Sequence, residues 1–319
     1  MVLWLLACGC DTAGPKPDDE AAPTQPDAAV TDVRVSLSAN TDKAPAVAGT
    51  LLFHSDRAGR NHLYRLDLAT GVIAGVTEGR GYHDEEPAPS PDGRRVAFIT
   101  TRFDHRTFDV AVMKVDGTAV QRVTSHLGFE RHPVWAADGR HLFFTGEEAG
   151  TQAVYRIAVA DGAILRLSPP PDRALMAEAS PDGRRVAYVL GTAAGLRAVI
   201  HDLSTGARRE VTPPGQDVAE PAWSVDGVRL AYARFEPGGS TIEAVTLASG
   251  AVTRWRVPGL STLREPAWSP DGRWLAATGS AATGRGEDWD VVLLPIAGGV
   301  AYRVTSGVAH DHAPSWLRP

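Results

Sequence analysis

Short runs of alternating apolar and polar residues recur along most of the chain, and turn-forming residues bound each run. The runs are rich in β-branched and aromatic residues, as in Val96–Ile99, Val186–Val189 and Leu230–Tyr232. Alternation with a period of two predicts strands with one buried face. Between the runs stand Asp-Gly, Thr-Gly and Ser-Gly pairs, whose glycine accepts the positive φ that closes a tight hairpin. The pattern therefore predicts an all-β protein of short strands joined by hairpins.

The strands are grouped into a repeat of 44 to 46 residues. Its clearest copy, Glu265–Gly272, reads Glu-Pro-Ala-Trp-Ser-Pro-Asp-Gly. Further complete copies begin at Glu86, His132, Met176 and Glu220. A truncated copy, Ala313–Trp316, lies at the end of the chain. Each complete unit holds four strands, and a four-stranded sheet repeated at this period indicates a propeller blade.

The number of units predicts how the propeller closes. Residues 50–77 supply three strands of a further unit that lacks its first strand, and Pro314–Trp316 supplies that strand from the other end of the chain. Closure protects the strand edges that an open array would expose. We therefore expect a six-bladed β-propeller over residues 48–319, with the ring closed by the C-terminal strand joining the N-terminal blade.

The repeat resembles that of a known family. Pro-x-Trp-Ser-Pro-Asp-Gly followed by (Val/Leu)-Ala-(Phe/Tyr) is similar to the WD40-like, or PD40, repeat of TolB-like propellers, and Ser55–Arg57 with Leu63-Tyr64 is similar to a segment of TolB-type blades. Related units occur in the propellers of prolyl oligopeptidase-type enzymes and of oligogalacturonate lyase. The resemblance covers about residues 48–318 and implies a TolB-like propeller without the α/β domain that precedes it in TolB. Since Pro89 and Ala179 replace the repeat tryptophan, we expect those two blades to pack differently.

The first eight residues resemble the end of a bacterial lipoprotein signal peptide. Met1–Cys8 is a short apolar run in which Leu5-Leu-Ala-Cys8 is similar to a lipobox, although the basic segment that usually precedes it is missing. We interpret residues 1–8 as a signal remnant whose true start codon lies upstream, with Cys8 as the lipidation site and Cys10 as the alternative acceptor. The other interpretation is a random apolar start that happens to contain two cysteines.

Residues 9–47 are rich in Pro, Ala and Asp and have almost no aromatic residues, so they cannot bury enough apolar surface to fold. We expect a disordered tether there, within which the patch Val33–Leu37 favours a short strand. The expected location is the bacterial cell envelope, either the periplasm or the outer membrane and cell surface. The protein would contact the membrane only through its lipid anchor.

Composition excludes several classes of function. The formal net charge is −6 and only three residues are lysine, so we expect no nucleic-acid partner. Both cysteines lie before residue 11, which excludes thiolate catalysis and cysteine-ligated zinc in the propeller. The chain has no P-loop, no His-Glu-x-x-His and no Gly-x-Ser-x-Gly elbow. We expect a monomer with no catalytic residues and no cofactor, or with a divalent metal ion in the alternative described next.

Candidate chemistry gathers just before the repeated proline, where segments of neighbouring blades should meet at the channel mouth. The candidate binding residues are His83, Asp84, Glu86, Glu130, His132, Glu220, Glu265, His310, Asp311 and His312. Four of them, His83, His132, His310 and His312, form a possible site for a divalent metal ion, since imidazoles and carboxylates suit such metals. Oligogalacturonate lyase, as the family comparison implies, uses a histidine-rich metal site in a related propeller. The alternative interpretation is that these side chains cap loops, form ion pairs or face channel water.

Other polar and aromatic repeats have simpler interpretations. Glu86, Glu220 and Glu265 are expected either to form an acidic rim that attracts a basic partner or a cation, or to be solvated loop charges. The repeat tryptophans are expected in the core between blades rather than on a stacking platform. The remaining histidines, including His54, are interpreted as surface or strand residues.

These observations support three hypotheses of function. The first is a non-catalytic scaffold that binds an envelope protein or peptide through one face or the channel mouth. The second is a metal-dependent polysaccharide lyase or hydrolase that uses the histidine cluster. The third is a structural module with no small ligand.

Overall fold

The computed structural model describes residues 30–38, 47–125, 128–212, 215–283 and 286–318, and these residues form strands, turns and loops without any helix. The strand bounds, in chain order, are β1 (Val30–Leu37), β2 (Thr50–Ser55), β3 (His62–Asp67), β4 (Ile73–Gly75), β5 (Asp84–Pro89), β6 (Arg95–Thr100), β7 (Asp109–Lys114), β8 (Gln121–Arg122), β9 (Arg131–Trp135), β10 (His141–Glu148), β11 (Thr151–Ala158), β12 (Ile164–Arg166), β13 (Arg173–Ala179), β14 (Arg185–Thr192), β15 (Gly195–Asp202), β16 (Arg208–Glu210), β17 (Val218–Trp223), β18 (Arg229–Glu236), β19 (Gly239–Thr246), β20 (Val252–Arg256), β21 (Thr262–Trp268), β22 (Trp274–Thr283), β23 (Gly286–Pro295), β24 (Gly299–Arg303) and β25 (Asp311–Leu317).

The predicted turn chemistry is confirmed at the hairpin between β5 and β6. Ser90 Oγ donates a hydrogen bond to Asp92 Oδ1 at 2.6 Å, and Asp92 Oδ1 also accepts the backbone N–H of Arg94 at 3.2 Å. Gly93 has φ of 66°, the left-handed value that glycine tolerates best. The same Ser–Asp bond closes the equivalent turns that begin at Ser180, Ser224 and Ser269.

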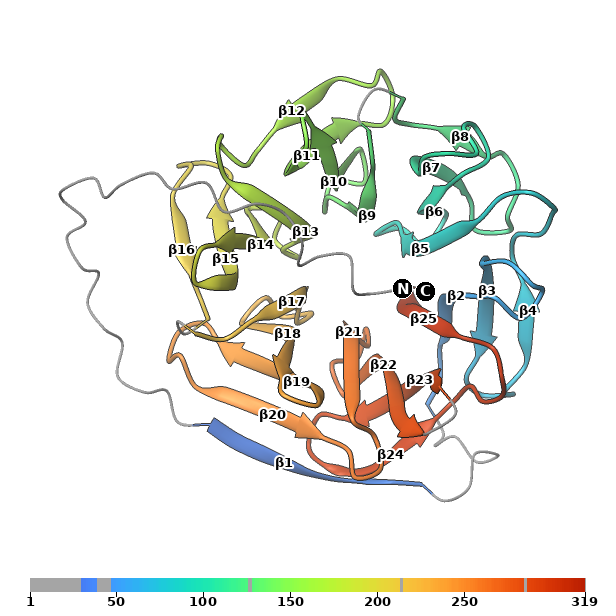
Figure 1. Ribbon diagram of the computed structural model, residues 1–319, viewed down its shortest axis with the longest axis vertical. Helices are drawn as coiled ribbons and strands as arrows, with labels where there is room; N and C mark the ends of the chain where they lie inside the picture. The colour runs from blue at the N-terminus through green and yellow to red at the C-terminus, as the bar shows by residue number, and fades with distance from the viewer. Residues whose placement is uncertain (1–29, 39–46, 126–127, 213–214, 284–285, 319) are drawn as a thin grey trace.

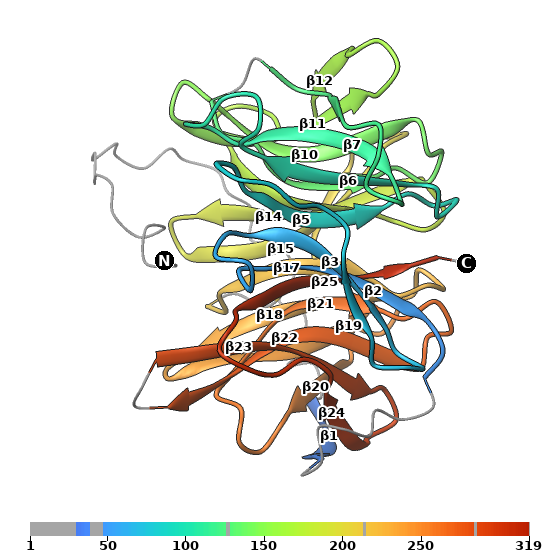
Figure 2. The same ribbon diagram turned by 90° about the vertical axis from the view of Figure 1, so that its right-hand side faces the viewer.

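The sheets are arranged radially around one axis, with β5, β9, β13, β17, β21 and β25 nearest to it (Figure 1). Within the described residues, four sheets have four strands each: β25-β2-β3-β4, β5-β6-β7-β8, β12-β11-β10-β9 and β13-β14-β15-β16. The side view of Figure 2 shows that neighbouring sheets face one another and twist. The second and third strands of each sheet are covered on both faces, as in β6, where Val96 on one face and Ala97 on the other are fully buried. This is the all-β propeller that the repeat predicts.

The prediction of a six-bladed propeller is wrong. The remaining described strands form one nine-stranded sheet in the order β17-β18-β19-β20-β1-β24-β23-β22-β21. Strand β1 pairs in parallel with β20, from Val30↔Val252 to Arg34↔Arg256, and then with β24, from Val35↔Gly299 to Leu37↔Ala301. Two groups of four strands that the repeat predicts as separate blades are thereby joined at their outer edges (Figure 1).

The physical reason for this correction lies outside the repeat. Without β1, strands β20 and β24 would present unpaired backbone groups at their outer edges, and such edges accept a further strand. Val35 is buried against the cluster that contains Trp255 and Ala301, and Val33 and Leu37 pack at its border. The strand predicted at Val33–Leu37 is thus confirmed and extends to Val30. It lies inside the segment 9–47 that sequence interprets as a tether, whereas residues 1–29 and 39–46 lie outside the described residues.

The C-terminal strand β25 pairs with β2, so the two ends of the propeller share one sheet. The register places Leu51 opposite Trp316 and His54 opposite His312. The guanidinium of Arg57 donates two hydrogen bonds to Asp311, at 2.8 and 3.0 Å, across the same pair of segments. Paired strands and a bidentate ion pair therefore hold the ends of the ring together.

The repeat tryptophans lie between sheets, as predicted. Trp135, Trp223, Trp268 and Trp316 are each at most 7% exposed. Each indole N–H donates to a carbonyl of the preceding innermost strand, at 3.0 to 3.1 Å. These residues are core rather than a stacking platform for a ligand.

Candidate functional site

A channel of about 560 Å³ runs along the axis between the innermost strands. Its wall consists mainly of the repeated Pro, Ala and Trp positions, together with the turn prolines Pro91, Pro181 and Pro270. Among the candidate binding residues, those that line the channel are Glu86, His132, Glu220 and Glu265. The structure therefore brings four of the predicted binding residues to one cavity.

Each innermost strand has a bulge at the position just before its repeated proline, or before Ala177, which takes the place of that proline in β13. Glu86, His132, Met176, Glu220, Glu265 and Ala313 all have φ between 51° and 58°. This left-handed conformation is uncommon for residues other than glycine and costs about 1–3 kcal/mol. At five of these positions the N–H has a side-chain acceptor from the preceding unit, so a bond between units offsets the strain.

The candidate carboxylates supply three of those acceptors. Glu86 Oε2 accepts the N–H of His132 at 2.6 Å, and Glu220 Oε2 accepts the N–H of Glu265 at 2.7 Å. Glu265 Oε2 in turn accepts the N–H of Ala313 at 2.7 Å. These glutamates therefore link one innermost strand to the next around the channel.

Cations balance the same carboxylates, so the rim does not carry charge of one sign. Arg131 lies 3.1 Å from Glu86, and Arg264 forms an ion pair with Glu220. Burial alone would favour the neutral acid, but the charges of His132 and Arg131 lower the pKa of Glu86. A mouth of mixed charge does not select a basic partner through its net field.

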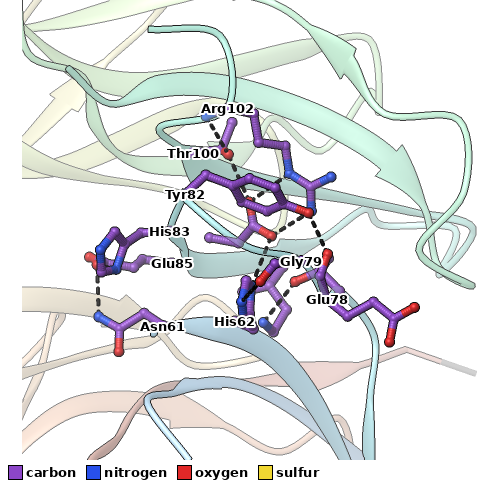
Figure 3. A network of polar contacts seen from close by, with 12 residues as sticks. Asn61, His62, Glu78, Gly79, Tyr82, His83, Glu85, Thr100 and Arg102 are labelled. Atoms are coloured by element: carbon purple, nitrogen blue, oxygen red, sulfur yellow. Dashed lines mark hydrogen bonds and ion pairs between the residues drawn. The ribbon is translucent and has the colours of Figure 1, made fainter. Parts of the chain in front are cut away.

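Asp84, Glu130 and Asp311 are fully buried and are not among the residues that line the channel. Arg102 donates two hydrogen bonds to the carboxylate of Asp84, from Nε at 2.9 Å and from a terminal nitrogen at 2.5 Å. The hydroxyl of Thr100 donates a third at 2.7 Å. Figure 3 shows Arg102 lying over the ring of Tyr82, at 4.3 Å. Asp84 and the matching Asp311 thus hold a loop to the sheet rather than face a ligand.

The four candidate metal ligands are not brought together. His83 accepts a hydrogen bond at Nε2 from Arg60 at 2.9 Å, and Figure 3 shows its ring near Glu85. His132 lies 3.7 Å from Glu86, and His312 lies 3.5 Å from Glu265. The backbone of His310 is bonded to Asp56. No group of three His, Cys, Asp or Glu side chains suited to a metal ion occurs within the part of the chain that the structure describes.

Sequence reasoning missed His54, which belongs to a cluster with His312 and the channel-lining Glu86. His54 stacks on His312 at 5.5 Å, and its Nδ1 accepts the N–H of Glu86 at 3.3 Å. Burial and the neighbouring His312 lower the pKa of His54 to about 4, which keeps it neutral and able to accept. Burial opposes the charge on His312, but its bond to Glu265 raises its pKa. The pairing of residues 50–55 with the C-terminal strand was the signal that could have placed His54 beside His312.

Sequence reasoning also missed Glu178, which lines the channel half-buried. It occupies the position between the repeated Pro and Trp, where other units have Ala88, Val134, Ala222, Ala267 or Ser315. Burial raises the pKa of Glu178 to about 8, with Arg318 opposing the shift. A charged residue at an otherwise small, uncharged repeat position was the signal available in the sequence.

Comparisons with known proteins place the repeat in context. A family model described as the TolB beta propeller domain matches residues 67–219. An uncharacterized protein of Agrobacterium fabrum is 25% identical over 211 residues, which cover 62% of this chain and 71% of that protein. The Tol-Pal system protein TolB of Anaeromyxobacter sp. is 28% identical over 194 residues, 58% of this chain and 43% of that protein.

Among solved structures, TolB from Acinetobacter baumannii has a TM-score of 0.73 at 18% identity, and the match covers 84% of this chain and 66% of that one. Identity at this level shows a shared fold alone. The match also spans less than half of the length of the Anaeromyxobacter relative. Partners and activities of those proteins therefore enter only as grounds for a proposal.

Proposed function

Because this chain is a TolB-like propeller protein, we propose that it is a non-catalytic scaffold that binds an envelope protein, or a peptide segment of one, at its central channel. Relatives named as Tol-Pal system proteins support a place among envelope components. Because the match covers only part of the length of these relatives, the proposal does not name their partner as the partner of this chain.

The observation that carries this proposal is the state of the channel side chains. The wall offers proline, alanine and tryptophan surfaces together with half-buried polar groups, which is the composition of many binding clefts. Three of the channel carboxylates that could have served as acid or base, Glu86, Glu220 and Glu265, are instead bonded to backbone N–H groups, and arginines pair with Glu86 and Glu220. A general base must be free to reach a substrate proton, whereas a binding wall needs rigid, satisfied groups.

Site-specific photo-crosslinking tests the channel proposal. A photoreactive phenylalanine analogue at Val134, in the channel wall, should form an adduct with a defined envelope protein in intact cells. The same analogue at the exposed Ile164, on the outer strand β12, serves as the matched control. An adduct that forms equally at both positions, or only at Ile164, would contradict a channel partner.

We further propose that Cys8 is acylated and anchors the propeller in the cell envelope. Cys8 lies outside the described residues, and no described residue lies in a helix long and apolar enough to span a membrane. With the upstream start restored, Cys8→Ser should abolish acyl labelling and membrane association. If labelling persists in Cys8→Ser and disappears in Cys10→Ser, then Cys10 is the acceptor instead.

A further inference from the structure

The tryptophan of the repeat fills the same place at four of the described contacts between strand groups. Trp135 is the clearest example, since it packs in one cluster with Ala97 and Val112 of the preceding sheet. The guanidinium of Arg95 lies over its ring at 4.4 Å. Arg185 covers Trp223 and Arg229 covers Trp268 in the same way, at 4.6 and 4.5 Å. The repeat therefore defines a space between neighbouring groups of strands that an indole side chain fills.

The contact between sheet β9–β12 and sheet β13–β16 has a different set of residues around that space. Ala179 replaces the tryptophan, and Phe143 stands where Ala97 lies in the preceding sheet. His141 and Arg156 occupy the positions of Arg95 and Val112. The larger Phe143 takes part of the space that the missing indole leaves.

A cavity of about 290 Å³ remains at this contact, and we call it the interface pocket. Phe143, His141, Arg156 and Ala179 line it, which are the residues that replace the tryptophan and its neighbours. An apolar cavity of about 150 Å³ is enough to hold benzene. The interface pocket therefore has room for a bicyclic aromatic ring. Its exposed lining residues Asp138, Asp182 and Gly183 make it reachable from solvent.

Within the described residues, the charged side chains that line the interface pocket are paired except for one arginine. Asp138 is bonded to His141 Nδ1 at 2.7 Å, and Asp182 lies 3.2 Å from Arg185. Arg156 is half-buried, and within the described residues its guanidinium has no hydrogen bond or ion pair. A guanidinium in such a site favours a planar anion, because it can donate two parallel hydrogen bonds to a carboxylate.

We propose that the interface pocket binds a planar aromatic ring that carries a carboxylate. The ring takes the space of the missing indole against Phe143, and the carboxylate pairs with Arg156. Two sources offer this chemistry: a free aromatic acid, or the C-terminal aromatic residue of a partner peptide. The interface pocket shares Ala179 with the wall of the central channel, and its proposed ligand does not depend on a channel partner.

Calorimetric titration of the purified protein tests the charge requirement. N-acetyltryptophan carries both groups, and its amide lacks the charge. We expect the acid to bind at least about tenfold more tightly than the amide. Arg156→Gln should remove this difference, whereas Arg65→Gln, an exposed arginine at the same register position in sheet β25-β2-β3-β4, should leave it intact. Equal affinities for acid and amide, or no heat of binding up to about 10 mM acid, would overturn the proposal.

A double variant tests the location. Phe143→Ala with Ala179→Trp recreates the alanine and tryptophan pair found at Ala97 and Trp135, so the protein's own indole fills the pocket. We expect binding of N-acetyltryptophan to be lost while the melting temperature stays at or above the wild-type value. Should this folded variant bind the acid as the wild type does, the site is elsewhere and the proposal fails.

The two sources are then separated with two further probes. Indole-3-acetate represents a free aromatic acid, and a short peptide that ends in tryptophan represents a protein C-terminus. The source is a protein if the peptide binds about tenfold more tightly than N-acetyltryptophan, and a small molecule if indole-3-acetate does so. Both results require that Arg156→Gln weakens the binding.

Discussion

At the scale of single residues, the environment of each carboxylate decides its role. Asp84 is fully buried and bonded to Arg102, so it holds a loop in place. Glu86 lines the channel, yet its carboxylate already accepts a backbone N–H and pairs with Arg131. Glu178 lines the same channel, and burial raises its pKa to about 8. Residue type alone therefore does not separate structural acids from acids available to a ligand.

Glu178→Gln should stabilise the protein at high pH. Since the folded pKa is raised from an ordinary value near 4.5 to about 8, the folded state retains a proton that the unfolded state loses in this range. Stability linked to Glu178 is therefore present below about pH 4.5 and is lost as the pH rises towards 8. We expect the variant to gain on the order of 1 kcal/mol or more over wild type at pH 8, and nothing at pH 4.

Thermal unfolding across this pH range measures the effect, with Glu210→Gln on the exposed strand β16 as the control. If the curves of wild type and Glu178→Gln run parallel from pH 4 to pH 9, the raised pKa is refuted.

Arg102→Ala should be strongly destabilising. It leaves the carboxylate of Asp84 buried without its bidentate partner, and breaking a buried pair from one side costs about 3–5 kcal/mol. Urea unfolding gives the value, and Arg94→Ala, an exposed arginine in the neighbouring turn, should cost less than about 0.5 kcal/mol. A loss below about 1 kcal/mol for Arg102→Ala would show that water solvates Asp84 in the folded protein.

At the scale of elements, β1 has the largest effect on the architecture. It belongs to no repeat unit, yet it pairs with β20 through one half and with β24 through the other. Its alternation buries Val35 and exposes Val30, as expected for a strand with one face on the core. One strand from outside the repeat is enough to turn two outer edges into the middle of a nine-stranded sheet.

Val35→Asp should detach β1 from both edges. The change places a charge in the cluster around Trp255, and the freed backbone groups of β20 and β24 would become available to solvent and to other chains. Hydrogen exchange in both strands should accelerate by about tenfold or more, and light scattering should report self-association. Val30→Asp lies on the same strand but is exposed, so it should change neither measurement. If the amides of β20 exchange as slowly in Val35→Asp as in the wild type, then pairing with β1 is not what protects them.

At the scale of the whole molecule, the ring depends on contacts between segments that are far apart in sequence. Strand β25 pairs with β2, Trp316 donates to Ala267, and the Ser315 hydroxyl donates to the Pro87 carbonyl. A single strand thus contacts the sheets on both sides of it. The channel has a continuous wall only because this strand is in place.

Deletion of residues 309–319 should abolish cooperative folding rather than remove one strand. The deletion exposes the backbone edge of β2, leaves Arg57 without Asp311 and opens the channel. Circular dichroism and size exclusion should report loss of the unfolding transition together with aggregation. The milder Trp316→Phe keeps the strand and removes only the indole hydrogen bond, so it should cost about 1 kcal/mol. A truncated protein that stays monomeric and unfolds cooperatively would show that closure is dispensable.

Much of the fold could be predicted because it depends on short sequence motifs that recur in each repeat unit. The Ser-Pro-Asp-Gly turns form as their side chains require, and the repeat tryptophans lie in the core. The resemblance to TolB-like propellers is confirmed by the family match over residues 67–219. The number of blades was wrong because β1 carries no repeat motif, and pairing between edges depends on which strands are left open in space.

Less of the candidate site could be predicted. Glu86, His132, Glu220 and Glu265, all chosen by their position just before the repeated proline, line the channel in the structure. Sequence position does not show that Asp84 and Asp311 are buried against arginines, since those partners lie in the loop after β6 and, for Asp311, in the turn after β2 at the other end of the chain. His54 and Glu178 were missed because a histidine in a strand and a glutamate in a degenerate repeat look ordinary until their neighbours are known.

The sequence by itself determined the strands of the repeat, the turns, the period and the place of each repeat tryptophan, because these depend on residues close together in the chain. Tertiary structure alone decided that β1 joins two groups of strands, that acids become links between innermost strands, and that a pocket remains beside Ala179. Burial and hydrogen bonding of a side chain depend on what other segments bring to it. Such contacts join segments that are far apart in the chain, so the repeat motif does not predict them.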